Sequence, residues 1–180
     1  MIFSTTAIDG LLVIQPQVFG DARGYFMETY NEDLFLKNGV NVYFKQDNQS
    51  MSNKGALRGL HYQAPPYAQG KLVRVINGAV WDVVVDIRKK SPTYGKHFAI
   101  ELNAENKTML WIPAGFAHGF LTLNDSTIFS YKCTEVYNKQ SEGGILWNDM
   151  QLGITWNIDN PILSEKDKLN TRFAEFDSPF

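Results

Sequence analysis

The stretch Arg58-Gly59-Leu60-His61-Tyr62-Gln63 combines a β-strand pattern with one of only three histidines in the chain. Histidine is the natural proton acceptor near neutral pH, and arginine is the natural clamp for a phosphate. In a regular strand Arg58 and His61 would point to opposite faces, because they lie an odd number of residues apart. Both can reach one pocket only if the chain bends or bulges at Gly59, and we expect that irregularity.

Short strand-like runs extend from this stretch in both directions. We expect strands at residues 10–15, 25–30, 43–51, 71–76, 79–88, 97–102, 108–112, 118–123, 127–136 and 143–147. The tight turns at residues 77–78 (Asn-Gly) and 124–126 (Asn-Asp-Ser) each predict a hairpin that pairs the two strands beside it. We expect residues 19–24 to form a turn or loop.

Helical signals are few. Asn31 can cap a helix over residues 31–39, in which acidic residues fill the first turn and Gly39 marks the end. Ser164 can cap a short helical turn over residues 164–168. Many short strands, little helix and no sustained βαβ alternation predict an all-β fold, an antiparallel sandwich or barrel, in a single domain over residues 1–180.

Composition limits the partners and the compartment. The formal net charge is -2 at pH 7 and no basic stripe occurs, so nucleic acid and anionic membranes are poor candidates as partners. No apolar run reaches a membrane-spanning length, and residues 1–10 lack the pattern of a signal peptide. Cys133 is the only cysteine, which excludes an internal disulfide and favours the reducing cytoplasm. We interpret Cys133 as a packing residue rather than a nucleophile.

The three histidines, His61, His97 and His118, raise the question of a metal site. A zinc or iron site needs two or three histidines together with a carboxylate or thiolate. Residues 113–118 (PAGFAH) resemble the second metal motif of cupins, whereas the first motif would need a histidine where Gln63 stands. We therefore expect no catalytic metal and no cofactor, and we interpret His97 as a surface or structural residue.

Polar residues recur on strand faces that should line the interior: Gln46, Asn48, Lys71, Asp82, Asp86 and His118. Buried polar groups need partners, so one such residue alone would indicate a structural hydrogen-bond network. So many of them together indicate a polar cavity. His61 taken alone could likewise be a satisfied structural histidine.

Eight motifs follow one another along the chain. They are residues 21–28 (DARGYFME), 46–50 (QDNQS), 57–63 (LRGLHYQ), 71–74 (KLVR), 82–88 (DVVVDIR), 111–120 (WIPAGFAHGF), 142–149 (EGGILWND) and 163–167 (LSEKD). Each motif alone is weak, but the ordered set closely resembles the dTDP-4-dehydrorhamnose 3,5-epimerase family. The resemblance implies a cupin-type jelly-roll sandwich or barrel with one or two short helices.

The resemblance also implies epimerisation of dTDP-4-dehydro-6-deoxyglucose at C3 and C5, in dTDP-rhamnose biosynthesis. The C4 carbonyl acidifies both neighbouring protons, so the reaction needs a base, an acid on the opposite face and stabilisation of the enolate. By resemblance His61 is the base, Asp167 orients it and Tyr131 is the acid. Lys71 would stabilise the enolate oxygen. From the residues alone, Tyr131 would more readily be a core aromatic and Lys71 a strand-edge lysine.

The same resemblance assigns binding positions. Arg23 and Arg58 would hold the pyrophosphate, and Phe26 and Tyr137 would contact the thymine ring. Further contacts to the nucleotide and the sugar would come from Glu28, Gln46, Asp47, Asn48, His118, Glu142 and Lys168. Lys168 stands where an arginine is often found, which replaces a bidentate clamp with a point charge. Alternatively, Arg23 and Arg58 could form surface salt bridges, and His118 could have a structural role.

The family forms homodimers in which the segment from Arg23 to Glu28 reaches the neighbouring subunit's site, so the resemblance implies a homodimer here. Other activities remain open. The same acid and base could serve an enzyme that epimerises only C3 or only C5 of a related dTDP-4-keto-6-deoxysugar. A non-catalytic nucleotide-sugar-binding cupin would not need His61, Tyr131 and Asp167, and Gln63 disfavours a metal-dependent cupin.

Overall fold

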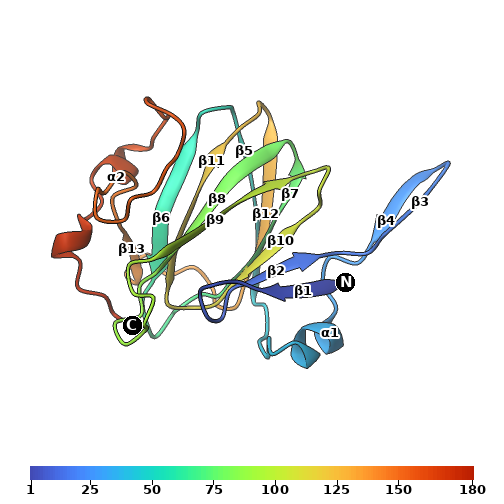
Figure 1. Ribbon diagram of the computed structural model, residues 1–180, viewed down its shortest axis with the longest axis horizontal. Helices are drawn as coiled ribbons and strands as arrows, with labels where there is room; N and C mark the ends of the chain where they lie inside the picture. Colours follow the sequence, from blue (N-terminus) through green and yellow to red (C-terminus); the bar gives the residue numbers. More distant parts are fainter.

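The computed structural model describes all 180 residues and contains two large antiparallel sheets that face each other as a sandwich (Figure 1). The six-stranded sheet runs in the order β1 (Ile2–Thr5), β2 (Leu12–Gln15), β10 (Met109–Ile112), β7 (Lys71–Asn77), β12 (Thr127–Cys133) and β5 (Gln46–Ser52). The five-stranded sheet runs in the order β13 (Glu142–Gly144), β6 (Leu57–Gln63), β11 (Phe116–Thr122), β8 (Ala79–Asp86) and β9 (His97–Asn103). The predicted all-β antiparallel sandwich is confirmed.

An apolar core fills much of the space between the two sheets. Successive side chains of a strand point to opposite faces of its sheet, so the inward-facing residues of both sheets meet in one cluster. Its members are Ile8, Leu11, Val73, Val75, Val80, Val84, Leu102, Leu110, Ile112, Phe116, Phe120 and Phe129. This core holds the two sheets at a fixed separation, which in turn fixes the walls of the cavity described below.

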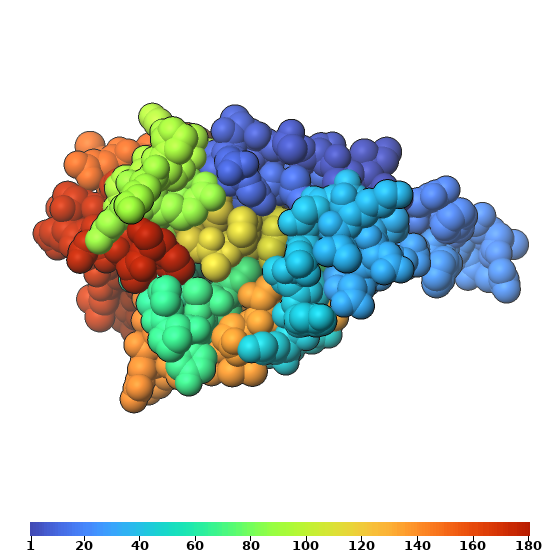
Figure 2. All heavy atoms as spheres, turned by 90° about the horizontal axis from the view of Figure 1, so that it is seen from below, coloured from blue at the N-terminus to red at the C-terminus, as the bar shows by residue number.

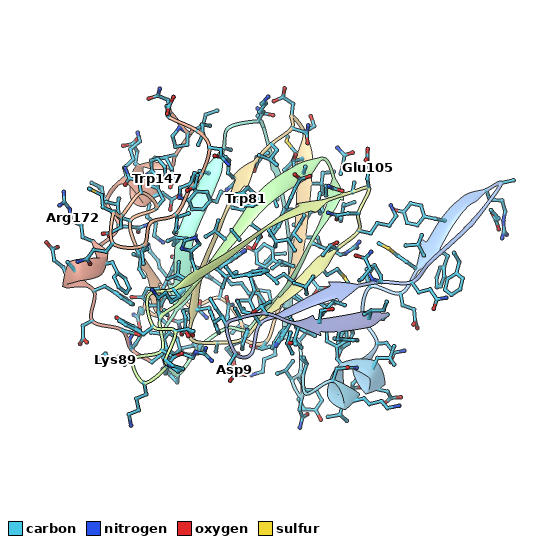
Figure 3. The ribbon with its side chains drawn as sticks, in the orientation of Figure 1. Asp9, Trp81, Lys89, Glu105, Trp147 and Arg172 are labelled. Atoms are coloured by element: carbon cyan, nitrogen blue, oxygen red, sulfur yellow. The ribbon has the colours of Figure 1, made fainter.

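Separate clusters cover the two outer faces. Phe35 of α1 (Glu32–Lys37) packs in a cluster with Leu72, Met109 and other residues on the outer face of the six-stranded sheet. The C-terminal segment, with α2 (Glu165–Lys168) and the 3-10 helix η1 (Phe173–Glu175), covers the five-stranded sheet. Trp81 and Trp147 pack in this second cluster (Figure 3).

Both predicted helix starts are confirmed. The Asn31 side chain accepts a hydrogen bond from the backbone N–H of Leu34 at the start of α1. The Ser164 hydroxyl accepts one from the backbone N–H of Asp167 at the start of α2. None of the helices has the length and apolar character needed to cross a membrane.

The two predicted hairpins are wrong, although the turns themselves occur. β7 and β8 flank Asn77-Gly78, but they belong to different sheets, as do β11 and β12 around residues 124–126. Gly78 has φ +79°, and a Cβ there would lie 2.3 Å from the Thr127 hydroxyl oxygen, so this turn is a tight corner between sheets. Of the successive connections from β5 to β12, only that between β8 and β9 stays within one sheet.

The turn or loop expected at residues 19–24 is confirmed only at residues 22–23, which form a turn between two strands. Residues 18–27 form a hairpin in which β3 (Val18–Asp21) pairs with β4 (Gly24–Met27). This hairpin projects away from the sandwich, as Figures 1 and 2 show from two directions. Its aromatic residues Phe19, Tyr25 and Phe26 are more than half exposed, at 54%, 59% and 65%. It therefore adds nothing to the core of its own chain.

Candidate active site

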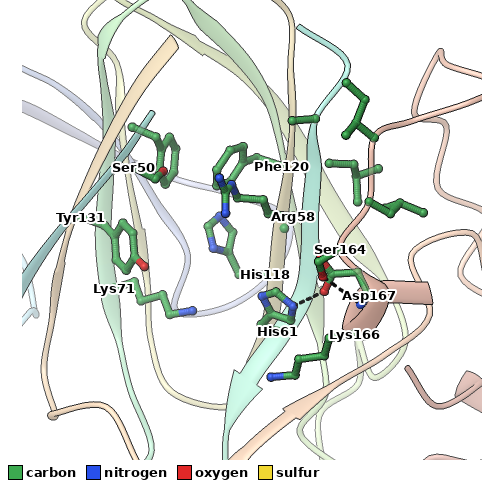
Figure 4. Close-up of a pocket in the computed structure, with 16 residues that line it drawn as sticks. Ser50, Arg58, His61, Lys71, His118, Phe120, Tyr131, Ser164, Lys166 and Asp167 are labelled. Carbon is green, nitrogen blue, oxygen red and sulfur yellow. Dashed lines mark hydrogen bonds and ion pairs between the residues drawn. The ribbon is translucent and has the colours of Figure 1, made fainter. Parts of the chain in front are cut away.

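A cavity of about 420 Å³ opens between the two sheets (Figure 4). One wall comes from β6 and β11, the other from β5, β7 and β12, and α2 lies at the side. A second hollow of about 350 Å³ adjoins it. His61, Lys71 and Tyr131 line both spaces, so the two are parts of one site.

The expected irregularity at Gly59 is confirmed. Arg58 and His61 both line the cavity. The pairing of β6 with β11 shifts register between these two residues. Gly59 has φ +136°, and a Cβ there would lie 2.5 Å from the Cα of Gly119 on the neighbouring strand. Only glycine accepts both that backbone conformation and that close approach, so the two glycines allow one strand to present Arg58 and His61 to one space.

His61 and Asp167 form a close pair although 106 residues separate them in sequence. The distance from His61 Nε2 to Asp167 Oδ1 is 2.5 Å. α2 is held in place because the segment before it pairs with the start of β6, through a parallel bridge between Ala56 and Ile162. The Asp167 carboxyl is the inner partner, with 4% of its side chain exposed against 30% for His61.

The charge of Asp167 sets the protonation of the His61 ring. Burial alone would raise the pKa of the Asp167 carboxyl, but hydrogen bonds from His61 and Ser164 outweigh it and hold the pKa below its usual range. An ionised carboxylate can only accept, so Nε2–H of His61 must donate to it. The other ring nitrogen, Nδ1, then carries the free lone pair and can act as a base.

Tyr131 and Lys71 face His61 from the opposite sheet (Figure 4). Burial raises the pKa of the Tyr131 phenol, so the hydroxyl keeps its proton at neutral pH. Burial lowers the pKa of the Lys71 ammonium, and the nearby Cys133, Asp82 and Glu142 partly offset this by favouring the charged form. The site thus places the His61 imidazole and a protonated phenol on opposite walls with the Lys71 amine beside them, which are groups of the types that proton transfer next to a carbonyl uses.

Arg58 and His118 also line this cavity (Figure 4), Arg58 as an exposed residue and His118 as a buried one. Arg58 Nε donates to the hydroxyl of Ser52 at 3.1 Å. Nε2 of His118 lies 2.9 Å and 3.0 Å from the two carboxylate oxygens of Asp82, which is fully buried. Asp82 therefore lies behind His118 rather than on the cavity surface.

The adjoining hollow holds four more of the expected residues. Gln46, Asn48, Tyr137 and Glu142 line it together with the shared residues. The Tyr137 hydroxyl donates to Glu142 at 2.9 Å, and Lys166 Nζ lies 2.5 Å from the same carboxylate oxygen. Burial alone would raise the pKa of Glu142, but these two partners outweigh it and hold the pKa below its usual range.

Five expected binding residues lie outside these spaces. Arg23 and Phe26 are on the projecting hairpin, Arg23 pairs with Asp21, and Glu28 follows the hairpin. Asp47 alternates with Gln46 and Asn48, so it points outward, where it pairs with Lys132. Lys168 pairs with Glu165 on the surface of α2. Of the polar residues expected to face the cavity, Asp86 is buried elsewhere with Arg88, Ser91 and Thr93.

Sequence reasoning missed three polar residues of the cavity: Ser50, Ser164 and Lys166. Alternation places Ser50 on the same face of β5 as Gln46 and Asn48, but the sequence assigns it no role in the site. Lys166 and Lys168 are both near Asp167, and nothing in the sequence distinguished the lysine that lines the cavity. Ser164 was identified only as a helix cap.

The residues do not form a metal-binding cluster. No group of three or more His, Cys, Asp or Glu side chains is arranged to hold a metal ion. Gln63 is fully engaged with the backbone, since its amide donates to the carbonyls of Tyr67 and Val136 and accepts from Asn138 N–H. His97 contacts the carbonyl of Leu152 at 3.0 Å, away from the cavity.

Comparison with known proteins gives consistent results. The family model described as dTDP-4-dehydrorhamnose 3,5-epimerase matches residues 5–175. The dTDP-4-dehydrorhamnose 3,5-epimerase of Shigella flexneri is 54% identical over 173 residues, covering 96% of each chain.

Two solved structures bear on the site. The dTDP-6-deoxy-D-glucose-3,5-epimerase of Legionella pneumophila Philadelphia 1, in complex with dTDP-4-keto-L-rhamnose, matches with TM-score 0.94 and 44% identity over 98% of this chain and 94% of that one. ChmJ, a 3'-monoepimerase from Streptomyces bikiniensis in complex with dTDP-quinovose, matches with TM-score 0.89 and 33% identity over 94% and 86%.

Proposed function

The chain belongs to the dTDP-4-dehydrorhamnose 3,5-epimerase family, and from that premise we propose how its residues perform the reaction. The enzyme is an isomerase that converts dTDP-4-dehydro-6-deoxyglucose to dTDP-4-dehydrorhamnose by epimerisation at C3 and C5. In our proposal His61 is the base and Tyr131 is the acid. One observation carries this assignment: the two side chains face each other from opposite sheets across one cavity.

The proposed steps are the same at each carbon. Nδ1 of His61 takes the proton from C3, and the electrons of the C–H bond move to the C4 oxygen to give an enolate. The Lys71 ammonium stabilises this oxygen. The phenol of Tyr131 then donates its proton to the opposite face of C3 and regains one from solvent, while His61 releases its proton. A second cycle at C5 completes the product.

The nucleotide is proposed to bind along the cavity and the hollow that adjoins it. Arg58 supplies a positive group for the pyrophosphate, His118 supplies a further polar contact, and Tyr137 supplies an aromatic face for the thymine ring. Stacking of a base on an aromatic side chain is worth about 1–3 kcal/mol in nucleic-acid complexes. We propose the cytoplasm as the compartment, which suits the single, unpaired Cys133.

We further propose that the active unit is a homodimer in which each hairpin completes the partner's site. Arg23, Phe26 and Glu28 lie outside the cavity of their own chain, and the hairpin presents exposed aromatic residues. A second copy of the chain would cover these residues and bring Arg23 to a pyrophosphate.

Mixing two inactive variants tests this arrangement. In a heterodimer of His61→Ala and Arg23→Ala chains, one site carries both defects and the other carries neither. Random exchange of subunits should therefore restore about a quarter of wild-type activity, because half of the dimers then hold one intact site. If no mixture exceeds the activity of its separate components, each site is built from one chain.

The reaction itself is tested by incubating the protein with dTDP-4-dehydro-6-deoxyglucose in deuterated water and following C3 and C5 by NMR. Label at both carbons, unaffected by a chelator, is expected. Label at C3 alone would support a monoepimerase like the ChmJ neighbour, and loss of activity with chelator would overturn the metal-free assignment. His61→Ala should abolish exchange at both carbons while nucleotide binding is retained, and normal exchange in this variant would exclude His61 as the base.

A further inference from the structure

Ser164 makes two hydrogen bonds to the same residue in opposite directions. Its hydroxyl accepts from the backbone N–H of Asp167 at 3.1 Å, and it donates to Oδ2 of the Asp167 carboxylate at 2.8 Å. Ser164 also lines the cavity. The first contact is an ordinary helix cap, whereas the second is not needed to cap a helix.

The two oxygens of the Asp167 carboxylate therefore have separate partners. Oδ1 accepts from His61 Nε2–H and Oδ2 accepts from the Ser164 hydroxyl, as the dashed lines in Figure 4 show. The carboxylate cannot rotate without breaking both bonds. With only 4% of the side chain exposed, little water is available to replace a lost donor.

We propose that Ser164 is a positioning residue that forms a Ser164–Asp167–His61 relay and holds the base for proton abstraction. This inference rests on the proposed roles of His61 and Asp167. Ser164 acts through the carboxylate and needs no contact with the substrate.

The physical effect of Ser164 is on the charge and the orientation of Asp167. A hydrogen bond donated to an ionised carboxylate favours the ionised form, and this bond helps to hold the pKa of Asp167 below its usual range. An ionised, fixed carboxylate keeps Nε2–H as the donor, so Nδ1 faces the cavity as the lone-pair nitrogen. Without Ser164 the carboxylate could turn away from the ring.

Three variants separate this role from helix capping. Ser164→Ala removes both hydrogen bonds, and Ser164→Gly also removes both but leaves a residue that is tolerated almost as well at a helix start. Ser164→Thr keeps the hydroxyl. If donation to Asp167 is the main role, the Ala and Gly variants should lose activity equally and Thr should be close to wild type.

The measurement is the steady-state rate of epimerisation together with ¹³C NMR titration of labelled aspartate carboxyls. We expect kcat to fall roughly tenfold in Ser164→Ala and Ser164→Gly, with KM unchanged, as for loss of an interaction made in the transition state. The pKa of Asp167 should rise toward its usual value in both variants. Loss of a helix cap alone would not move that pKa.

Several outcomes would overturn the proposal. A Gly variant with wild-type kcat, a change confined to KM, or an unmoved Asp167 pKa would each show that Ser164 only caps α2 or contacts substrate. His61→Ala is run in parallel. If His61→Ala keeps normal exchange, the proposed role of His61 as the base fails and the relay fails with it. If His61→Ala is inactive and Ser164→Gly is normal, only the relay fails.

Discussion

Replacing Asp167 by Asn removes the negative charge beside His61 with almost no change of shape. In the proposed mechanism the His61 ring takes up the substrate's proton and becomes an imidazolium. Two unit charges about 4 Å apart attract by about 4 kcal/mol at an effective dielectric constant of about 20. Solvent screens part of this, because 30% of the His61 side chain is exposed. We therefore expect kcat to fall roughly 100- to 1000-fold, which corresponds to about 3–4 kcal/mol.

The assay is the initial rate of deuterium entry at C3 of the keto sugar, followed by NMR over a range of substrate concentrations. Asp125→Asn is the matched control, because Asp125 lies on an exposed turn where it accepts from Lys54 N–H. The control should have wild-type kcat, and binding of dTDP to Asp167→Asn should be unchanged by calorimetry. A fall in kcat of less than about threefold, or an effect confined to KM, would refute the argument that the charge of Asp167 supports the base.

Three further results are expected. Lys71→Met should lower kcat by roughly 100- to 1000-fold with dTDP binding retained, as for removal of an oxyanion stabiliser, and near-normal turnover would assign the enolate to another group. In Gly119→Ala the new Cβ would lie 2.7 Å from the carbonyl oxygen of Arg58, so urea titration should show an unfolding free energy about 1–3 kcal/mol lower than that of wild type. An unchanged urea midpoint would mean that β6 and β11 can move apart at little cost. Burial alone would raise the pKa of Asp86, but its hydrogen bonds lower it to about 2. A carboxyl with a lowered pKa stabilises the fold fully above about pH 4 and loses that contribution as the pH falls toward 2. Wild type should therefore lose roughly 2 kcal/mol of unfolding free energy over this range that Asp86→Asn does not lose. Equal losses of stability in the two proteins, measured by urea titration from about pH 5 to 2, would contradict this.

The turns show what local sequence could and could not predict. Asn77-Gly78 and residues 124–126 were recognised as tight turns because Gly and Asn accept unusual backbone angles. The turn chemistry does not determine whether the next strand pairs with the previous one or crosses to the facing sheet. That choice depends on which faces the whole set of strands can bury, so β7 and β8 lie in different sheets despite the hairpin signal.

Within the site, the alternation of side chains along a strand correctly predicts which residues face the cavity. The odd separation of Arg58 and His61 required an irregularity at Gly59, and the register shift in β6 supplies it. Alternation also placed Gln46 and Asn48 on the inward face of β5. The contact between His61 and Asp167 joins residues far apart in sequence, and only the resemblance to a known family suggested it. No periodicity in a single sequence encodes such a pair.

Short and projecting elements were the least predictable. α2 is a single helical turn, and the direction in which Lys166 and Lys168 point depends on how that turn packs against the C-terminal segment and β6. The β3–β4 hairpin packs few of its side chains on its own chain, so its sequence lacks the alternation of a buried strand. Glycines at residues 20 and 24 made it resemble a loop.

The central claim is that His61 and Tyr131 act on opposite faces of the sugar, and Tyr131→Phe tests it most directly. Without the phenol, His61 can still remove a proton and return a solvent deuteron from its own side. NMR of the sugar after incubation in deuterated water should therefore show label at C3 in substrate that keeps its original configuration, with inversion almost abolished. If exchange and inversion are lost to the same extent, or if inversion continues at the wild-type rate, the division of roles between the two walls of the cavity is contradicted.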